Sequence, residues 1–354
     1  MTMLNVALIF GGRSADRDIS MRSARYIYEA LDRQRYNPIL VGVAHDGKWW
    51  LQENAREFPL HVDSSGAQIT FLAGGGGKAL VYTDNGCART CQVDVVFPLF
   101  QEGILEGLLE RAQVPFVGSR FPAPAICMDK HITKRILRDA GFSVARFLAS
   151  SDREEVDFQF AQKTLGSRSL FVKPASFHSS IGVSKVSCEA EFEAAIDLAF
   201  SYGRKVIIEE YVQARELACA VLEDAIKPSK LLCSWPNEII PTGQDAFFTH
   251  RTKIDGKGLI VKIKAELDET VADLLRGLAC EAFRAIGCEA FGRVDFFMRP
   301  NGDVLINEVG TFPSLKPFSM FPKMMRELGF PYKVLIQRLI ENAIGRAERV
   351  STEL

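Results

Sequence analysis

The chain has 354 residues, with 43 Lys and Arg against 44 Asp and Glu and a formal net charge of −1. This balance argues against a strongly basic nucleic-acid-binding surface and against an acidic tail. Hydrophobic residues make up 47% and charged residues 25%, as is ordinary for a soluble globular protein, and the length predicts two or three domains. No segment reaches the roughly 18 uninterrupted apolar residues of a membrane span, and the start lacks the basic region of a signal peptide. We therefore expect a cytoplasmic protein.

The eight cysteines lie scattered in apolar or helical surroundings. Only Cys87 and Cys91 are close in sequence, and no second pair or nearby histidine completes a zinc site with them. This distribution favours reduced thiols that pack as small hydrophobic residues.

The chain opens with the pattern strand, helix, strand. Leu4–Phe10 is an apolar run that ends at a glycine pair, Ser20–Leu31 has apolar residues at helical spacing, and Pro38–Ala44 is a second apolar run. A βαβ order predicts that the two strands pair in parallel. Residues 46–86 are patterned less regularly. After them we expect a strand, a helix and a strand, at Val93–Leu99, Leu105–Ala112 and Val114–Val117.

From about Met128 the pattern changes to two successive α+β units. The first is expected to hold a helix, two strands, a helix and a strand, at His131–Ala140, Leu170–Lys173, Val183–Val186, Glu189–Phe200 and Lys205–Glu210. The second is expected to hold a strand, an irregular stretch, a helix, two strands and two helices, at Leu217–Leu222, Asn237–Gly258, Asp268–Ile286, Gly292–Met298, Val304–Asn307, Ser319–Glu327 and Tyr332–Ala343. The predicted fold class is α/β and α+β, with a doubly wound N-terminal domain at 1–127 and two lobes at 128–215 and 216–354.

A lysine and a polar loop end one of the predicted strands. Lys173-Pro174 closes the strand, and the following segment Ala175–Gly182 contains three serines and ends in glycine. Backbone N–H groups and a lysine ammonium in such a loop can wrap a phosphate group. An ordinary hairpin turn is the alternative interpretation.

Two adjacent acids end the next buried strand. Glu209-Glu210 lead into Tyr211-Val212, and Glu216 follows after a short connector. Carboxylates in this position can accept hydrogen bonds from an adenine amino group and a ribose. A solvated strand end is the alternative.

Arginine and carboxylate side chains share two predicted neighbouring strands. Arg293 and Asp295 alternate on the first strand, and Glu308 follows Asn307 near the end of the second. Antiparallel pairing would bring Asp295 and Glu308 to one face, where their oxygens can hold a Mg²⁺ ion shared with substrate phosphates. Arg293 would point the same way and stabilise developing negative charge. The alternative, a surface ion pair of Arg293 with Asp295, is weakened by the apolar neighbours.

These segments occur in one order, and together they resemble the D-alanine–D-alanine ligase family of ATP-grasp enzymes over nearly the whole chain. The matching segments are Gly11–Asp16, Met128–Lys130 with Thr133-Lys134, Phe171–Pro174 with Ser179–Gly182, Glu209-Glu210 with Glu216, Arg293–Asp295, and Asn307-Glu308 with Pro313. The resemblance implies a doubly wound N-terminal domain followed by a two-lobed ATP-grasp fold. It also implies an ADP-forming carboxylate–amine ligase that uses ATP with Mg²⁺ or Mn²⁺.

The implied reaction has two steps: ATP phosphorylates the carboxylate of one amino acid, and the amine of a second attacks the acyl phosphate. The resemblance assigns residues to the ATP phosphates (Lys130, Lys173), to the adenosine (Glu209, Glu210, Glu216), to the same nucleotide-binding set (Ser180, Val212) and to the metal ion (Asp295, Glu308). Arg293 would stabilise the acyl phosphate and the tetrahedral intermediate. Asp16 would receive the ammonium of the first amino acid, with Ser179 supporting it.

The sequence departs from the family pattern around the substrates. After Leu99 a loop with a donor-side histidine is missing. Gly310 stands where the family has an asparagine, which leaves one metal-binding oxygen fewer, and Ser314 replaces a glycine whose N–H faces the oxyanion. In the mobile loop, Lys253 is followed by isoleucine instead of tyrosine, and His250 ends a segment that resembles ester-forming relatives that use D-lactate. A histidine or lysine near the acceptor controls whether an amine or a hydroxyl reacts.

We therefore expect an amino-acid ligase with D-alanine as the default substrate and with altered donor and acceptor loops. Two alternatives stay open: a ligase for another amino-acid pair or a hydroxy acid, and an ATP-binding homologue without turnover. The expected partners are small-molecule amino acids, with no nucleic acid and no membrane, and dimers are common in the family. The candidate lids over ATP are Ala175–Gly182 and Gly243–Gly258, because an acyl phosphate hydrolyses when water enters.

Overall fold

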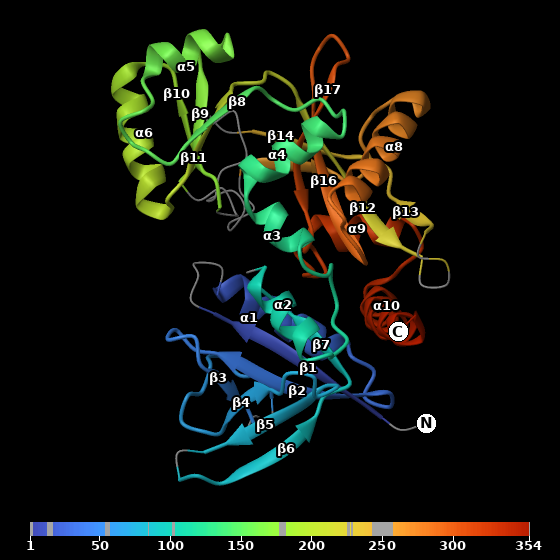
Figure 1. Ribbon diagram of the computed structural model, residues 1–354. Coiled ribbons are helices and arrows are strands. Elements are labelled where there is room, and N and C mark those ends of the chain that lie inside the picture. The colour runs from blue at the N-terminus through green and yellow to red at the C-terminus, as the bar shows by residue number, and fades with distance from the viewer. Residues whose placement is uncertain are drawn as a thin grey trace.

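The computed structural model describes residues 3–12, 17–53, 57–83, 85–100, 103–176, 182–224, 227, 229–242 and 258–353. Its strands form three sheets that follow one another along the chain, and helices pack against them (Figure 1). The predicted fold class is confirmed by this mixed architecture. The domain limits at 127/128 and 215/216 stay a prediction.

The first sheet begins with the predicted βαβ unit. Strand β1 (Leu4–Gly11) is followed by helix α1 (Arg17–Ala30) and strand β2 (Tyr36–Val43), and the two strands are parallel over their whole length. Strand β7 (Val95–Pro98) pairs in parallel with the other side of β1. This arrangement places the end of β1 at the carboxyl edge of the parallel strands, where α/β sheets bind ligands.

Residues 46–86, whose sequence pattern is less regular and to which no strands were assigned, extend this sheet. They contribute β3 (Trp49–Leu51), β4 (Gln68–Phe71) and β5 (Lys78–Tyr82), and these pair antiparallel with β2 and with one another, followed by β6 (Ala88–Gln92). The sheet order is β6-β5-β4-β3-β2-β1-β7, so the sheet is mixed and not wholly parallel. Strands of three to five residues are too short to show a clear alternation in sequence, which explains why they were not predicted.

Two short helices connect the first sheet to the second. Helix α2 (Ile104–Arg111) confirms a predicted element, and α3 (Ala123–Met128) was not predicted. The strand predicted at Val114–Val117 is reduced to a single bridge between Phe116 and Val96. Pro115 explains part of this difference, since proline has no N–H group to donate to a strand ladder.

The second sheet forms the central lobe. Helix α4 (Lys130–Asp139) precedes it, and its four strands are β8 (Phe147–Ser150), β9 (Leu170–Pro174), β10 (Ser184–Val186) and β11 (Val206–Glu210) in the antiparallel order β10-β9-β11-β8. Helices α5 (Phe158–Leu165) and α6 (Glu189–Tyr202) pack against this sheet. The sequence predicted neither β8 nor α5.

The third sheet forms the C-terminal lobe. Its strands are β12 (Arg215–Glu223), β13 (Leu231–Cys233), β14 (Asn237–Pro241), β15 (Leu259–Lys262), β16 (Phe291–Met298) and β17 (Val304–Gly310). Its helices are α8 (Glu269–Ala285), α9 (Met320–Glu327) and α10 (Tyr332–Glu353). The path β15-β14-β12-β16-β17 places the two strands with the predicted metal-binding acids side by side.

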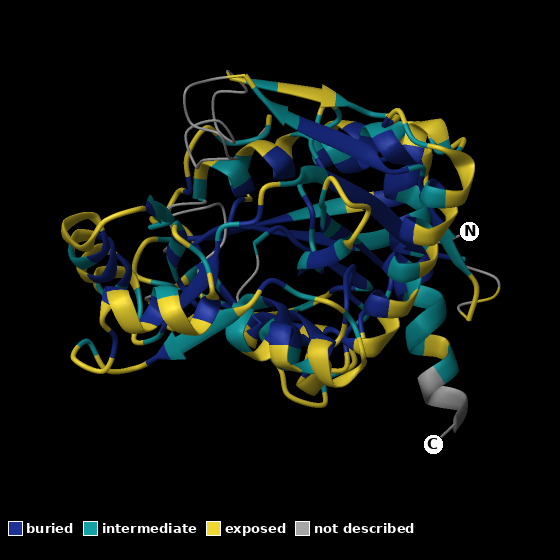
Figure 2. Ribbon diagram, turned by 90° about the horizontal axis from the view of Figure 1, so that it is seen from above, coloured by how far each residue is buried: buried dark blue, intermediate teal, exposed yellow. Residues whose placement is uncertain are grey.

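Buried residues line the strands and the inner faces of the helices (Figure 2). One hydrophobic core is continuous from the first sheet, through Phe97 and Leu8, to Phe291 of the C-terminal lobe and Leu335 of α10. The central lobe has its own core around α5, α6 and its sheet. The N-terminal sheet and the C-terminal lobe therefore share one apolar interior, and helix α10 lies between them (Figure 1).

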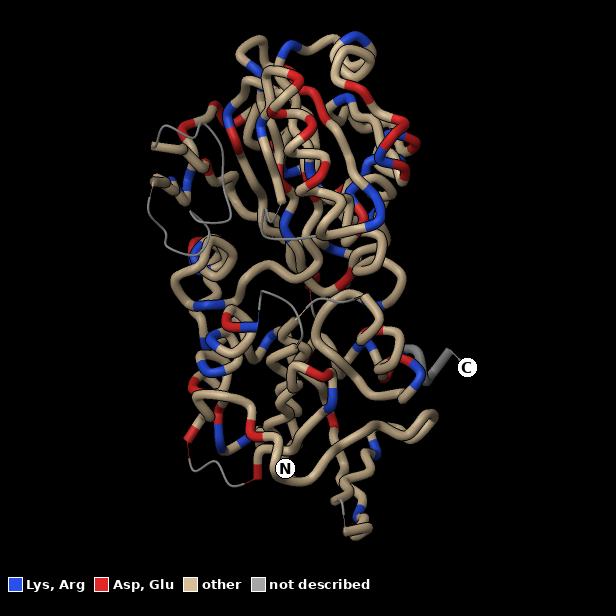
Figure 3. The backbone as a smooth tube through the Cα atoms, turned by 90° about the vertical axis from the view of Figure 1, so that its left-hand side faces the viewer, with Lys and Arg blue, Asp and Glu red and all other residues tan. Residues whose placement is uncertain are grey.

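Acidic and basic residues are interspersed over the length of the molecule (Figure 3). All eight cysteines are free thiols. Among the described residues, no helix combines the length and the apolar character needed to cross a membrane.

Candidate active site

Two carboxylates face each other on neighbouring strands, as predicted. Strands β16 and β17 are antiparallel, with Asp295 opposite Glu308 and Arg293 opposite Gly310. Residues directly opposite each other in such a pair have Cβ atoms about 4.5–5.5 Å apart. The ladder shifts by a bulge between Asp295 and Phe296, and bulges often re-aim side chains beside active sites. Two hard carboxylate donors at this spacing fit a Mg²⁺ or Mn²⁺ ion, with water completing its coordination.

Arg293 and Asp295 form a forked ion pair. Nε of Arg293 donates to Oδ1 of Asp295 and Nη2 donates to Oδ2, both at 2.6 Å. The two side chains are 19% and 18% exposed, so this is a mostly buried pair and not the surface pair considered as the alternative. Burial opposes the charge of Arg293, but Asp295 and Glu308 outweigh it and raise the pKa of the guanidinium. The site therefore holds a permanent positive charge beside two metal-type ligands.

Glu209 sits between two lysines in the interior. Its Oε2 lies 2.6 Å from Nζ of Lys173 on β9, and its Oε1 lies 3.2 Å from Nζ of Lys134 on α4. Glu209 is 2% exposed and Lys134 is 1% exposed. The solvated strand end considered for Glu209 is therefore wrong.

The charges of this buried group are mutually dependent. Burial opposes the ionisation of Glu209, yet the two ammonium groups outweigh it and lower the pKa of the carboxyl below its ordinary value. Burial lowers the pKa of Lys134, while Glu209 and, more weakly, Glu308 favour its charged form. Lys134 therefore interacts electrostatically with Glu308, one of the two acids predicted to bind the metal ion.

Glu210 is engaged on the opposite face of β11, as strand alternation requires. Oε2 accepts from Nη2 of Arg146 at 2.6 Å, and Oε1 accepts from the backbone N–H of Arg146 at 2.9 Å. Arg299 adds a bond to Oε1 at 3.2 Å. Burial alone would raise the pKa of Glu210, but these partners lower it. The two adjacent acids therefore cannot both direct their side chains at one nucleoside.

The remaining nucleotide-site predictions fall on segments that meet near this cluster. The backbone N–H of Lys130, at the start of α4, donates to the carbonyl of Ala175 at 2.8 Å, which ties the helix to the end of β9. Val212 is buried with Leu305 where the central and C-terminal lobes meet. Glu216 lies on β12 opposite Phe297 of β16. These positions border the central and C-terminal lobes, while their roles toward ATP stay predictions.

Ser314 lies in the segment after β17. Its hydroxyl is 2.9 Å from the hydroxyl of Ser319, the residue before α9. This contact holds the loop that leaves the metal-type strand. Predictions that rest on Asp16, Ser179, Ser180, His250 and Lys253 fall outside the described residues.

Sequence reasoning missed three of these contacts. Lys134 belonged to a matching segment but received no role, and its burial was the missing information. Arg146 and Arg299 carried no local signal, because they reach Glu210 from separate elements. Such partners become visible only when the chain is folded.

Comparison with known proteins identifies the family. The model described as "D-ala D-ala ligase N-terminus" matches residues 5–119, and that described as "D-ala D-ala ligase C-terminus" matches residues 136–341. A D-alanine–D-alanine ligase of Bradyrhizobium sp. (strain ORS 278) is 39% identical, with 98% of this chain and 97% of that protein covered. D-alanine–D-alanine ligase A of Escherichia coli (strain K12) is 38% identical, with 98% and 97% covered.

Solved structures give the same answer. The D-alanine–D-alanine ligase from Coxiella burnetii superposes with a TM-score of 0.85 at 30% identity, covering 100% of this chain and 97% of that one. The VanG D-Ala:D-Ser ligase from Enterococcus faecalis gives 0.79 at 27% identity, covering 97% and 100%. Together with the paired acids, the buried arginine and the lysine cluster, these matches show that the chain belongs to the D-alanine–D-alanine ligase family, ATP-dependent, ADP-forming amino-acid ligases with an ATP-grasp fold.

Proposed function

We propose that this protein joins two D-alanine molecules, using ATP and Mg²⁺, in the cytoplasm. The observation that carries the proposal is the register of β16 and β17, which sets Asp295 opposite Glu308 with Arg293 on the same strand. The relatives are named for D-alanine, and most of this chain matches them. A homodimer is part of the same proposal, and light scattering of the purified protein tests it.

The proposed chemistry proceeds in two displacements. A carboxylate oxygen of the first amino acid attacks the terminal phosphorus of ATP, the bond to ADP breaks, and an acyl phosphate forms. The amine nitrogen of the second amino acid then attacks the acyl carbon, phosphate leaves, and the nitrogen loses a proton. Asp295 and Glu308 would hold the metal ion, which supplies charge neutralisation for the phosphate oxygens when bound.

Arg293 is proposed to act on the charge that develops during these steps. Its guanidinium carries a fixed positive charge in a mostly buried place, where an interaction with an oxyanion is worth more than in water. A metal ion would draw on the oxygens of Asp295, and the fork of Arg293 would then be partly available to the acyl phosphate. Lys173 would contact the ATP phosphates from the end of β9, held in place by Glu209.

A product assay tests the proposal. Phosphate release is measured with ATP and pairs drawn from D-alanine, D-serine, D-lactate and their L-forms, and the products are identified by mass spectrometry. Formation of D-alanyl-D-alanine from D-alanine alone supports the proposal. Turnover restricted to another pair would replace the substrate assignment, and ATP binding by calorimetry without turnover of any pair would exclude the enzymatic proposal.

A further inference from the structure

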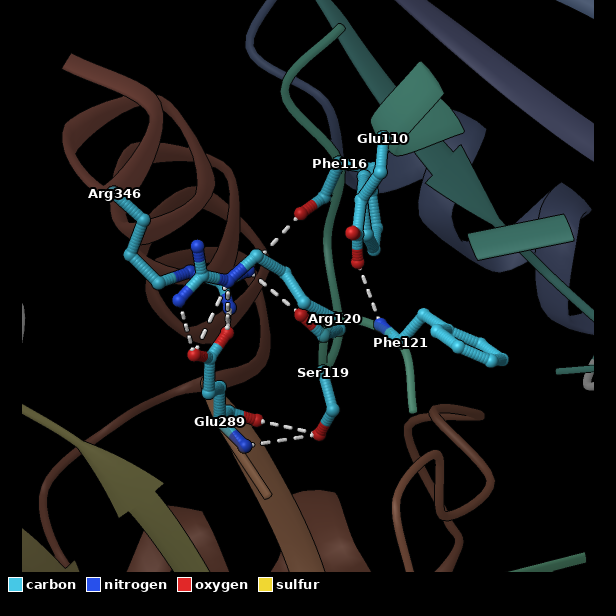
Figure 4. A network of polar contacts seen from close by, with 8 residues as sticks. Glu110, Phe116, Ser119, Arg120, Phe121, Glu289 and Arg346 are labelled. Carbon is cyan, nitrogen blue, oxygen red and sulfur yellow. Dashed lines mark hydrogen bonds and ion pairs between the residues drawn. The ribbon is translucent and has the colours of Figure 1, made fainter. Parts of the chain in front are cut away.

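An ion-paired cluster joins three distant parts of the chain (Figure 4). Glu289 lies just before β16, and Arg120, from the connector after the first sheet, donates to Oε1 from Nη2 at 2.6 Å and to Oε2 from Nε at 2.8 Å. From the other side, Nη1 of Arg346 on α10 donates to Oε2 at 2.9 Å. Ser119 Oγ completes the contact by bonding both the carbonyl and the N–H of Glu289, at 2.9 and 3.0 Å. We call Arg120, Glu289 and Arg346 the clasp.

The clasp is built around a buried cation. The side chain of Arg346 is 11% exposed, and its Nη2 also donates to the carbonyls of Phe116 and Gly118, at 3.1 and 2.7 Å. Burial opposes the charge of Glu289, but the two guanidinium groups outweigh it and lower the pKa of that carboxyl. A guanidinium that reaches a carboxylate and two carbonyls at once fixes their relative positions, because its donors are held in one plane.

The clasp is connected to the catalytic strand by a short, tightly packed stretch. Ala290, next to Glu289, is 1% exposed and has a φ of 60°, a left-handed backbone conformation that is uncommon for residues other than glycine. Gly292 packs closely against β17, since a Cβ there would lie 2.9 Å from the carbonyl oxygen of Gly310. A displacement of Glu289 would therefore shift the backbone that carries Arg293, four residues later.

The other end of the clasp belongs to the first sheet. The N–H of Val117 donates to the carbonyl of Val96 on β7 at 2.9 Å, and the N–H of Val96 donates to the carbonyl of Pro115 at 2.8 Å. Strand β7 pairs with β1, which leads directly into the sequence segment of Asp16. The clasp thus spans the side expected to receive the first amino acid and the side that carries Arg293.

We propose that Glu289 is a positioning residue for the ligation, because the clasp fixes the position of the first sheet relative to β16. The inference rests on the proposed function. The shared apolar core holds the two parts together, but hydrophobic contacts are non-directional and do not by themselves fix one relative position. The forked, charge-assisted hydrogen bonds of the clasp are directional and do fix it. As a positioning residue, Glu289 touches no substrate and acts only through the backbone on either side.

Glu289→Gln tests the inference, because it removes the charge and keeps the shape. Misplacement by a fraction of an ångström should lower kcat about tenfold and raise the KM of the first amino acid, while the Kd of ATP, measured by calorimetry, changes less than about twofold. Arg346→Lys keeps the charge without the planar fork and should give the same split. The matched control is Glu193→Gln on α6, an acid that pairs with Arg153 inside the central lobe and should leave both constants unchanged.

A second readout is independent of turnover. Amide hydrogen exchange of residues 116–120 should speed up in Glu289→Gln and stay unchanged in Glu193→Gln. A variant that melts at a lower temperature with unchanged kinetics would overturn the inference and leave the clasp a purely structural contact, as would a parallel loss of ATP affinity. Kinetics are measured with the amino-acid pair that the wild-type protein joins. If that pair is not D-alanine with D-alanine, the proposed function is contradicted. The role of Glu289 is then judged from the kinetics with the pair that is joined and from hydrogen exchange.

Discussion

At the scale of single residues, Arg293 is paired with Asp295, and in the proposed reaction its guanidinium would also interact with the developing negative charge. Its Nε and Nη2 groups both donate to Asp295, and that carboxylate is also a proposed metal ligand. Only interactions that strengthen in the transition state raise kcat. An arginine that exchanges a carboxylate for a developing oxyanion meets that condition, and its always-charged guanidinium needs no proton transfer to do so.

Replacing Arg293 by alanine should separate catalysis from nucleotide binding. We expect kcat of Arg293→Ala to fall by about 10²–10³ because a charge stabiliser is lost, while the Kd of ATP stays nearly unchanged. Phosphate release and calorimetry measure the two quantities. Arg293→Lys, which keeps a charge but not the fork, should be intermediate. A fall in ATP affinity equal to the fall in kcat would instead place Arg293 in ground-state binding.

Gly310 offers a gain-of-function experiment on the metal site. It lies opposite Arg293, and within the part of the chain that the structure describes a Cβ there would meet only the carbonyl oxygen of Arg293, at an ordinary contact distance of 3.8 Å. Gly310→Asn should therefore fit and add an oxygen ligand, which lowers the Mg²⁺ concentration needed for half-maximal activity. Gly310→Ala is the control, since it adds the Cβ without the oxygen. Equal Mg²⁺ dependence of the two variants would contradict the prediction.

At the scale of elements, the triad Lys134–Glu209–Lys173 ties α4 to β9 and β11. Water screens these charges poorly, because the side chains of Lys134 and Glu209 are almost fully buried. Removing one partner of a buried ion pair leaves the other charge buried without a counter-charge, which strongly destabilises the folded protein. The triad therefore fixes Lys173 at the end of β9, where it is proposed to contact the ATP phosphates, and couples the central sheet to the helix before it.

Removing the central charge should destabilise the protein strongly. Glu209→Gln leaves Lys134 and Lys173 facing each other without a counter-charge, and we expect the free energy of unfolding at pH 7 to fall by about 3–5 kcal/mol. Urea denaturation measures it. The exposed pair broken by Glu193→Gln should cost at most about 1 kcal/mol. Similar losses for the two variants would show that the triad adds nothing beyond a surface pair.

The same triad predicts an acid limb in the stability profile. The folded pKa of Glu209 lies below its ordinary value, so its contribution is present above the ordinary glutamate pKa of about 4.3 and is lost as the pH falls through the folded pKa. The stability difference between the wild type and Glu209→Gln should be largest near neutral pH and shrink below about pH 4.3. A difference independent of pH down to pH 3 would rule out this linkage.

At the scale of the whole molecule, one hydrophobic core is shared between the first sheet, the C-terminal lobe and α10. The first sheet and the C-terminal lobe each have a further core of their own, and the central lobe encloses another. An aromatic chain crosses the shared boundary, with Phe312 5.3 Å from Phe291 and 6.3 Å from Phe97 between ring centroids. We infer that the first sheet and the C-terminal lobe unfold as one unit.

Cutting this aromatic chain tests the shared core. Phe291→Ala should lower the free energy of unfolding by about 3–5 kcal/mol, because a fully buried ring is removed. The three tryptophans, at 49, 50 and 235, lie in the first sheet and the C-terminal lobe, so their fluorescence follows this unit alone. One transition with a lowered midpoint is expected. Two tryptophan transitions, only one of them shifted, would show separate interiors.

The order of the long elements could be read from the sequence, whereas the residues that it assigns to ATP stay predictions. Apolar runs of five or more residues and helical spacing predicted β1, α1, β2, α8 and β16, since their burial follows one period. Alternation along β16, with the end of β17, was enough to predict the facing of Asp295 and Glu308. The family was predicted from short motifs that occur in a fixed order along the chain.

The partners of charged residues that are far apart in sequence emerged from the folded structure. The short strands β3 to β6 are held by their neighbours and carry too little local pattern, and the burial of Glu209 between lysines from α4 and β9 depends on contacts far apart in sequence. The clasp joins residues 120, 289 and 346. Ion pairs of this kind cost desolvation and gain energy only in a fixed geometry, so residue type predicts their charge and the fold alone selects their partners.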